Sequence, residues 1–394
     1  KTSDRGGAIF NYNGNLDISD SMFKNNRASG TWGRDQYGGA IYSNGDLRVS
    51  NCNFTKNKAK TDGGAIYADA KVTATSSIFI INEAAGASSQ CYAGAIYCTN
   101  IDCDKCIFDN NHAYDYGGAI YINNKGKSTI KNSKFTNNKA DDYNGGAIYS
   151  KKNIEVYNSL FKNNQINNSW SPSTSQVGAI YCGTITCNNC TFENNKAKKY
   201  AGAIYINDKE VSTIKNSKFI NNTSPFNGGS INANGKLIVE SSIFKNNKAD
   251  HFGGALEPYE NGGAILCLNI DCNNSTFENN YAECYGGAIF ISSKGKSTIK
   301  NSKFINNTAK LNGGAIYLDN TNSHVDLIHN IFEKNTAERG NEGLIVYTYG
   351  EFDKISQNYY GTENPNWSSH LLYELFQKFR YLLLFKRSLK KLYL

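Results

Sequence analysis

The amino-acid sequence predicts an all-β protein, a right-handed single-stranded parallel β-helix of about thirteen coils. Two short marks recur together along most of the 394 residues, usually at steps of 24 to 32 residues, a period that indicates stacked supersecondary units. The runs between the marks, such as "AIYI" and "STIKNSKF", are rich in β-forming residues and show no helical periodicity. Strands this short pair with their copies in the next coil, and parallel crossovers are right-handed.

The first mark is Gly-Ala-Ile-Tyr or a close variant, and the second is Phe-x-x-Asn. The first begins at Gly7, Gly39, Gly64, Gly94, Gly118, Gly146, Gly178, Gly202, Gly229, Gly254, Gly263, Gly287 and Gly314, with a faded copy at Gly343. The second begins at Phe23, Phe54, Phe79, Phe108, Phe135, Phe161, Phe192, Phe219, Phe244, Phe277, Phe304 and Phe332. The Gly254 mark has no Phe of its own, and we interpret it as a duplicated corner or bulge. Three coils, about 84 residues, are repeated as a block from Gly94, Gly178 and Gly263.

Alignment of the units on the Phe assigns the faces of each coil. The position five residues before the Phe is always apolar and is expected to face the core, and the position two before it carries a small or short side chain at a tight interior site. The Asn three residues after the Phe can adopt the left-handed conformation and bond to the same Asn of the next coil. The predicted structural ladder includes Asn111, Asn138, Asn164, Asn195 and Asn222. A Gly pair before the next strand fits a second corner that needs a positive φ or close backbone contact.

The chain shows no linker, and we divide it into a repeat domain and two short C-terminal parts. Residues 1–350 form the β-helix, residues 351–370 close it, and the basic tail 371–394 is either an amphipathic helix on an anionic surface or a truncated end. The chain begins with Lys1 one step before a repeat, so residue 1 is not expected to be the natural start. No run of eighteen apolar residues occurs, which predicts no transmembrane segment.

The charge pattern argues against a nucleic-acid-binding protein. The net charge of +8 comes from 42 basic and 34 acidic residues that are scattered along the chain, with no basic stripe before the last fifteen residues. A nucleic-acid footprint needs clustered positive charge. We therefore expect no nucleic-acid partner.

The pairing of Gly-Gly-Ala-Ile with Phe-x-x-Asn, over roughly residues 4 to 340, resembles the repeat of polymorphic outer-membrane proteins, whose passenger regions are β-helical adhesins. "NYYGTENPNW", residues 358 to 367, is similar to an element that closes β-helical segments in adhesin-like surface proteins of methanogenic archaea. These resemblances imply an extracellular, cell-surface protein that binds glycans or proteins of a host or neighbouring cell. The marks themselves are scaffold residues and imply no binding site, and the sequence shows no recognisable anchor.

The cysteines raise the question of a metal site. Cys98, Cys103 and Cys106, like Cys182, Cys187 and Cys190, show the C-x4-C-x2-C spacing of plant-type ferredoxins. The third copy has Cys267 and Cys272 but Ser275 in the last place, no fourth Cys recurs, and two of the three positions are interior ones. We therefore favour packed thiols, with disulfides within a coil as the first alternative and a metal site as the second. We expect no metal and no cofactor, and the odd total of eleven leaves at least one thiol unpaired in a monomer.

The Tyr of the first mark is the strongest candidate for ligand contact. If the Ile of Gly-Ala-Ile-Tyr faces inward, alternation turns the Tyr column outward, including Tyr121, Tyr149 and Tyr205. An exposed aromatic strip can stack on sugar rings or on a partner surface. The simpler interpretation is a structural ladder that covers the sheet.

The longest insertions between coils are "RASGTWGRDQY" (27–37) and "QINNSWSPSTSQV" (165–177), which place Trp32 and Trp170 on loops where specificity commonly resides. Asp141 and Asp142 are interpreted as a solvated turn, and no catalytic residue is predicted. We therefore expect a non-enzymatic adhesin-like protein. The alternatives are a β-helical polysaccharide lyase or hydrolase, which needs a carboxylate and basic cluster, and a stalk that would tolerate deletion of the central 84-residue block.

Overall fold

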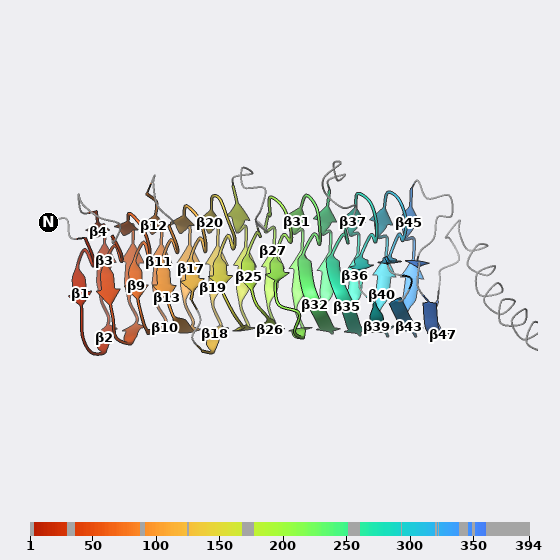
Figure 1. The fold of residues 1–394 in the computed structure, drawn as a ribbon, viewed down its shortest axis with the longest axis horizontal. Helices are drawn as coiled ribbons and strands as arrows, with labels where there is room; N and C mark the ends of the chain where they lie inside the picture. The colour runs from red at the N-terminus through yellow and green to blue at the C-terminus, as the bar shows by residue number, and fades with distance from the viewer. Residues whose placement is uncertain are drawn as a thin grey trace, which may run out of the picture.

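A computed structural model describes residues 4–29, 36–86, 91–123, 126–167, 177–250, 261–292, 294–319, 321, 323–338, 346–348 and 351–359. In these residues every regular element is a short β-strand, and the strands stack side by side into an elongated rod, from the red N-terminal end to the blue C-terminal end of Figure 1. Each coil contributes up to four strands, which form four columns along the rod, and paired strands run parallel.

The first and second columns are joined in one 24-stranded sheet. The first contains β1 (Ile9–Asn11), β5 (Ile41–Ser43), β9 (Ile66–Ala68), β13 (Ile96–Cys98), β17 (Ile120–Ile122), β21 (Ile148–Ser150), β25 (Ile180–Cys182), β28 (Ile204–Ile206), β38 (Ile289–Ile291), β42 (Ile316–Leu318) and β46 (Val346–Thr348). The second contains β2 (Leu16–Ser19), β6 (Leu47–Ser50), β10 (Lys71–Thr75), β14 (Asn100–Asp104), β18 (Ser128–Lys131), β22 (Ile154–Tyr157), β26 (Ile185–Asn188), β29 (Ser212–Lys215), β39 (Gly295–Lys300), β43 (Ser323–Ile328) and β47 (Glu351–Ser356). Because β32 (Ile231–Glu240) and β35 (Ile265–Asn273) pass through both columns, each column has thirteen levels.

The third column is a 12-stranded sheet that carries the repeated Phe. It contains β3 (Met22–Lys24), β7 (Asn53–Thr55), β11 (Ile78–Ile80), β15 (Ile107–Asp109), β19 (Lys134–Thr136), β23 (Leu160–Lys162), β27 (Thr191–Glu193), β30 (Lys218–Ile220), β33 (Ile243–Lys245), β36 (Thr276–Glu278), β40 (Lys303–Ile305) and β44 (Ile331–Glu333). The fourth column consists of two-residue strands: β4 (Arg27–Ala28), β8 (Lys58–Ala59), β12 (Glu83–Ala84), β16 (His112–Ala113), β20 (Lys139–Ala140), β24 (Gln165–Ile166), β31 (Thr223–Ser224), β34 (Lys248–Ala249), β37 (Tyr281–Ala282), β41 (Thr308–Ala309) and β45 (Thr336–Ala337).

The core is a narrow channel filled by stacked copies of the same residue. Phe108 pairs in register with Phe135, and their rings stack with centroids 4.6 Å apart. Both rings are fully buried, as are Ile120 and Ile130 from the first and second columns. The inward positions predicted from the sequence are confirmed, because in-register parallel pairing places each apolar side chain on its own copy.

The corner between the second and third columns explains the small residue two positions before the Phe. Asn132 adopts a φ of 49°, and the buried Ser133 follows it. The Ser133 hydroxyl accepts a hydrogen bond from the backbone N–H of Cys106 in the preceding coil at 3.1 Å, and the Ser133 N–H donates to Ser159 Oγ at 3.1 Å. Asn330 holds the same position in a later coil, where its Oδ1 accepts from the Ser302 N–H at 3.0 Å, so the site takes a short side chain that can accept this bond.

The corner after the third column contains the predicted Asn ladder. Asn138 Oδ1 accepts from both the backbone N–H and Nδ2 of Asn111 at 3.0 Å, and Asn138 Nδ2 donates to Asn164 Oδ1 and to the Phe108 carbonyl at 3.0 Å. The expectation that the ladder Asn itself is left-handed is wrong. The positive φ belongs to the residue before it, such as Asn137 at 55°. That residue turns the chain, and the next side chain then points inward along the rod.

The Gly pair serves two different purposes. Gly117 has a φ of 65°, which favours glycine. A Cβ on Gly118 would lie 2.1 Å from the Gly146 carbonyl oxygen and 2.6 Å from backbone atoms of Lys139. Both sequence-based explanations therefore hold: Gly117 has the positive φ, with its Cβ position 2.3 Å from the Ile120 carbonyl oxygen, and Gly118 lies at the close contact between coils.

The C-terminal boundaries are only partly described. β47 pairs with β43, so the parallel stack continues through Ser356, past the predicted end of the repeat domain at residue 350. Residues 360–394, the tail 371–394 and the Gly254 mark lie outside the described residues. The predicted divisions there stay predictions.

Candidate functional site

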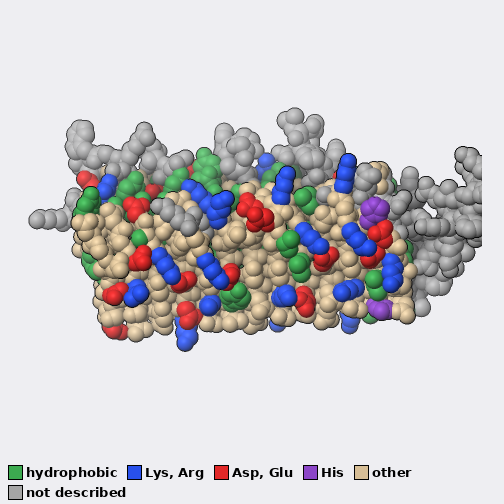
Figure 2. All heavy atoms as spheres, turned by 60° about the horizontal axis from the view of Figure 1, so that its bottom comes forward, with side chains coloured by type: hydrophobic (Ala, Val, Ile, Leu, Met, Phe, Trp, Pro, Cys, Tyr) green, Lys and Arg blue, Asp and Glu red, His purple; other side chains and the backbone are tan. Residues whose placement is uncertain are grey.

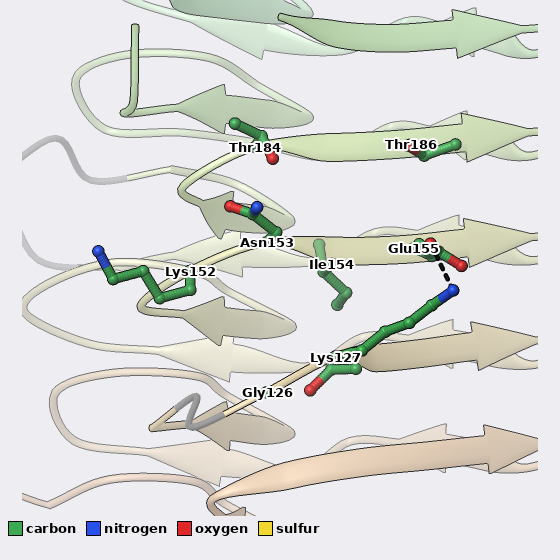
Figure 3. Close-up of a pocket in the computed structure, with 9 residues that line it drawn as sticks. Gly126, Lys127, Lys152, Asn153, Ile154, Glu155, Thr184 and Thr186 are labelled. Carbon is green, nitrogen blue, oxygen red and sulfur yellow. Dashed lines mark ion pairs between the residues drawn. The ribbon is translucent and has the colours of Figure 1, made fainter. Parts of the chain in front are cut away.

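A shallow groove lies on the outer surface where the first column turns into the second. Its volume is about 600 Å³. Nine residues from three consecutive coils line it: Gly126, Lys127, Ser128, Lys152, Asn153, Ile154, Glu155, Thr184 and Thr186. Figure 3 shows Lys127 reaching from one coil toward Glu155 on the next, with Thr184 and Thr186 on the coil beyond.

The groove arises because the connections between the two columns differ in length. Five residues separate β17 from β18, three separate β21 from β22, and two separate β25 from β26. The strands on either side remain in register, so the difference in length is confined to the corner. A local departure from the repeat therefore forms a groove on the surface of an otherwise regular rod.

An ionic and aromatic cluster borders the groove. Lys127 Nζ lies 2.8 Å from Glu155 Oε1, and the hydroxyl of Tyr157 donates to Glu155 Oε2 at 3.1 Å. The hydrogen bond and charge of Glu155 raise the pKa of Lys127, while partial burial, and then the hydrogen bond to Glu155, raise the pKa of Tyr157. The ammonium of Lys131 lies 5.9 Å from the centre of the Tyr157 ring. The groove thus offers cations, a carboxylate, hydroxyls and the edge of an aromatic platform.

Elsewhere on the surface the charges are mixed. Figure 2 shows basic and acidic side chains interspersed over the face it presents. Many form ion pairs between neighbouring coils, such as Lys58–Glu83 at 2.8 Å and Lys162–Glu193 at 3.0 Å. The absence of a nucleic-acid partner stays a prediction.

The Tyr column is a stacked ladder. The rings of Tyr121 and Tyr149 have centroids 5.0 Å apart, and the stack continues to Tyr181 and Tyr205 at 4.9 and 5.4 Å. The side chains of Tyr121 and Tyr205 are only 4% and 9% exposed. The expectation that these two residues present an open strip is wrong, because aromatic residues from the adjoining corner, such as Tyr92 beside Tyr121 at 4.6 Å, cover the column. Tyr149 is half-buried, and ligand contact by this column stays a prediction.

The two predicted tryptophans cannot be placed in the site. Trp32 and Trp170 lie outside the described residues. Their role in ligand contact stays a prediction.

All eleven cysteines are buried as free thiols. No cluster of three or more His, Cys, Asp or Glu side chains suited to a metal ion occurs in the part of the chain that the structure describes. Burial raises the pKa of the Cys98 and Cys182 thiols well above their usual range. These two thiols are chemically inert in the folded rod.

A polar cluster on the fourth column was not predicted. His112 Nε2 lies 2.7 Å from Asp141 Oδ2, and Lys139 Nζ lies 2.8 Å from Asp141 Oδ1. Burial favours the neutral acid, but the hydrogen bonds from His112 and Lys139 outweigh it and lower the pKa of Asp141. His112 comes from the preceding coil, so proximity along the sequence does not reveal it. Alignment of Ala113 with Ala140 would have placed the two side chains together.

Two buried carboxyl groups lie at the corner that precedes the first column. Asp62 Oδ1 accepts from the Tyr92 N–H at 2.9 Å, and Asp115 Oδ2 accepts from the Cys91 N–H at 2.6 Å. Burial raises the pKa of Asp62 to about 7 and that of Asp115 to about 6. Ionisation of these groups near neutral pH therefore opposes folding.

We expect Asp62→Asn to increase the free energy of unfolding at pH 8 by on the order of 1–3 kcal/mol. The pKa of Asp62 is higher in the folded protein than in the unfolded chain. The stability that Asp62 contributes is therefore complete below about pH 4 and is lost as the pH rises through about 7. An amide keeps the acceptor without the charge, and Asn144 and Asn261 hold the same position, before a positive-φ glycine, in other coils.

Urea unfolding at pH 5 and pH 8 measures this effect, with the exposed Asp17→Asn as the control. A variant at Asp62 that is no more stable than the unaltered protein at pH 8 would contradict the prediction.

Comparison with known proteins adds a family context to this geometry. A model of the right-handed β-helix region matches residues 91–249, and a model of the Chlamydia polymorphic membrane protein repeat matches residues 51–69, 274–292 and 301–319. The chain is a right-handed β-helix, and three of its segments are similar to the Chlamydia polymorphic membrane protein repeat. The fold class predicted from the sequence is confirmed, including its handedness.

The chain is similar to proteins that are named as an outer membrane protein, an autotransporter and a receptor-like protein. "Probable outer membrane protein pmp7" of Chlamydia pneumoniae is 25% identical over 292 residues, 61% of this chain and 31% of that protein. "Probable autotransporter YfaL" of Escherichia coli K12 is 30% identical over 243 residues, 55% of this chain and 18% of that protein. "Metabotropic glutamate receptor-like protein R" of Dictyostelium discoideum is 29% identical over 228 residues, 56% of this chain and 11% of that protein.

This repeat chain therefore spans less than a third of the length of these relatives. No solved structure matches it. Among the described residues, no helix is long and apolar enough to cross a membrane.

Proposed function

We propose that this β-helix is a non-enzymatic, extracellular part of a cell-surface protein and that it binds a glycan of a host or neighbouring cell through the groove at Lys127 and Glu155. The names of the relatives, an outer membrane protein and an autotransporter, support the surface location. The predicted kinship with adhesins of methanogenic archaea is part of this proposal.

The groove carries the proposal because its chemistry suits a saccharide. Thr184 and Thr186 present hydroxyls along one edge, and Lys127 and Glu155 offer a donor and an acceptor. Tyr157, joined to Glu155 by its hydroxyl, provides an apolar ring beside these polar groups. Sugars bind through such combinations of directional hydrogen bonds and ring contacts. The strands on both sides hold the backbone of these groups in place, which lowers the entropic cost of binding.

The enzymatic alternative, a polysaccharide lyase or hydrolase, would use the cluster of His112, Lys139 and Asp141. Both carboxylate oxygens of Asp141 are already bound, one by His112 and one by Lys139. A carboxylate held in this way as an ion is poorly suited to act as a general acid. Polysaccharide cleavage by the intact chain, lost in Asp141→Asn, would favour this alternative.

The test is a glycan array that includes neutral, uronic-acid-containing and sulfated chains, probed with the full chain. We expect Lys127→Ala to weaken binding of a retained glycan by about tenfold, since a charge-assisted contact is lost. Lys215→Ala is the matched control, because Lys215 forms an equivalent 2.8 Å ion pair with Glu240 on the second column, outside the groove.

Binding within about twofold of the unaltered chain is expected for the control. Equal losses in the two variants, or retention of no glycan by the unaltered chain, would refute the proposal.

A further inference from the structure

Four cysteines form two matched pairs inside the rod. Cys103 ends the inward face of β14, Cys106 lies just before β15, and Lys105 between them turns the chain with a φ of 56°. Both thiols face the interior and are at most 2% exposed. The block repeat places Cys187 and Cys190 in the same two positions three coils later.

Each pair converges on one serine of the following coil. Cys103 Sγ lies 3.6 Å from Ser133 Oγ, which also accepts from the Cys106 N–H at 3.1 Å. Cys187 Sγ lies 3.7 Å from Ser217 Oγ, which accepts from the Cys190 N–H at 3.1 Å. The second thiol of each pair lies near a backbone carbonyl oxygen of the preceding coil, with Cys106 Sγ 3.4 Å from Ala74 O and Cys190 Sγ 3.5 Å from Val156 O.

We propose that Cys103 with Cys106, and Cys187 with Cys190, are redox-active dithiols that oxidise to disulfides spanning the corner between the second and third columns. The coil geometry holds each pair together across a single turn. Only two residues separate the cysteines of each pair along the chain, and the second of them, Lys105 or Asn189, turns the chain with a φ of 56° or 57°. The proposal concerns a modification of the scaffold and does not depend on the glycan groove.

The chemistry needs a disulfide oxidant, such as glutathione disulfide. While the corner is still open during refolding, the thiolate of one cysteine attacks the oxidant, forms a mixed disulfide and releases one thiol; the sulfur of the second cysteine then attacks the sulfur of the first, forms the intramolecular bond and releases the second thiol. Two cysteine thiols lose two protons and two electrons, and one disulfide of the oxidant becomes two thiols.

The chain contains its own negative control. The third block has Cys272 in the first position and Ser275 in the second, with Cys272 Sγ 3.7 Å from Ser302 Oγ. Ser275 is as buried as Cys106, and its N–H likewise donates to the serine of the next coil. Serine is therefore compatible with this site, and Cys106→Ser is expected to fold. Conversely, Ser275→Cys restores the missing partner.

The experiment refolds the full chain in a reduced and oxidised glutathione mixture and maps disulfides by mass spectrometry of non-reduced peptides. We expect a mass about 4 Da below that of the fully reduced chain, one bond at each pair, and free thiols at the remaining cysteines. Cys106→Ser should lose one bond, and Ser275→Cys should gain a third bond with Cys272. Eleven thiols in the folded, oxidant-treated chain, or bonds that join other cysteines, would overturn the proposal.

Discussion

Gly118→Ala is expected to lower the free energy of unfolding by roughly 4 kcal/mol, or to prevent folding of the coils around it. The new methyl group would lie 2.1 Å from the Gly146 carbonyl oxygen and 2.6 Å from two backbone atoms of Lys139. These are backbone atoms of paired coils, so no side-chain rotation relieves the contact. Urea unfolding followed by circular dichroism measures the loss.

The neighbouring glycine provides the control for this substitution. Gly117→Ala is expected to cost less, about 1–2 kcal/mol for a left-handed Ala, although its Cβ would lie 2.3 Å from the Ile120 carbonyl oxygen and requires a small shift of the backbone. The chain itself tolerates alanine there, since Ala93 and Ala201 occupy the equivalent positions with φ of 63° and 55°. If the two substitutions lower the free energy of unfolding equally, the close approach of the coils does not explain why residue 118 is a glycine.

Asn138→Ala is expected to lower the free energy of unfolding by roughly 3–5 kcal/mol. The side chain of Asn138 is fully buried and participates in four hydrogen bonds, with Asn111 and the Phe108 carbonyl of the preceding coil and with Asn164 of the following coil. Alanine would leave the backbone N–H of Asn111 and one N–H of its side-chain amide without their acceptor in a buried site, while Asn164 Oδ1 would keep its bond from the backbone N–H of residue 138.

Because a solenoid can open locally, amide hydrogen exchange should accompany denaturation in this test. Faster exchange is expected in the coils of Asn111, Asn138 and Asn164, and little change is expected several coils away. Asn163→Gly is the control. Asn163 has a φ of 57°, which glycine tolerates, and its side chain donates one exposed hydrogen bond to Asn137, so a loss under about 1 kcal/mol is expected. A similar loss in both variants would contradict the ladder argument.

Residues that obey the repeat could be placed from the sequence. Ile120, Ile130 and Phe135 were assigned to the core by alignment alone, because parallel pairing without a register shift gives every copy the same surroundings. The left-handed residue at the ladder was misplaced by one position. The sequence holds two consecutive asparagines, Asn137 and Asn138, and local preference does not distinguish which of them turns and which points inward.

Features that depend on how the corners pack against the sheet could not be predicted from the sequence. Alternation indicates correctly that Tyr121 and Ile120 point to opposite faces, but it does not reveal that Tyr92 packs against Tyr121. The groove likewise comes from unequal connections, whose lengths are visible in the sequence but whose shape depends on the neighbouring coils. The pair of His112 and Asp141 joins residues 29 positions apart.

The Asn ladder also has a consequence for how such a chain can change in length. Along the ladder every Asn donates toward the coil that follows and accepts from the coil that precedes. Every coil therefore presents the same Asn donor to the coil that follows it and the same Asn acceptor to the coil that precedes it. If recombination adds or removes whole coils, each new pair of neighbours still joins a donor to an acceptor, and the fold and the direction of the ladder are preserved. The addition or removal of part of a coil does not preserve them. The chain can thus evolve longer and shorter forms in whole-coil steps.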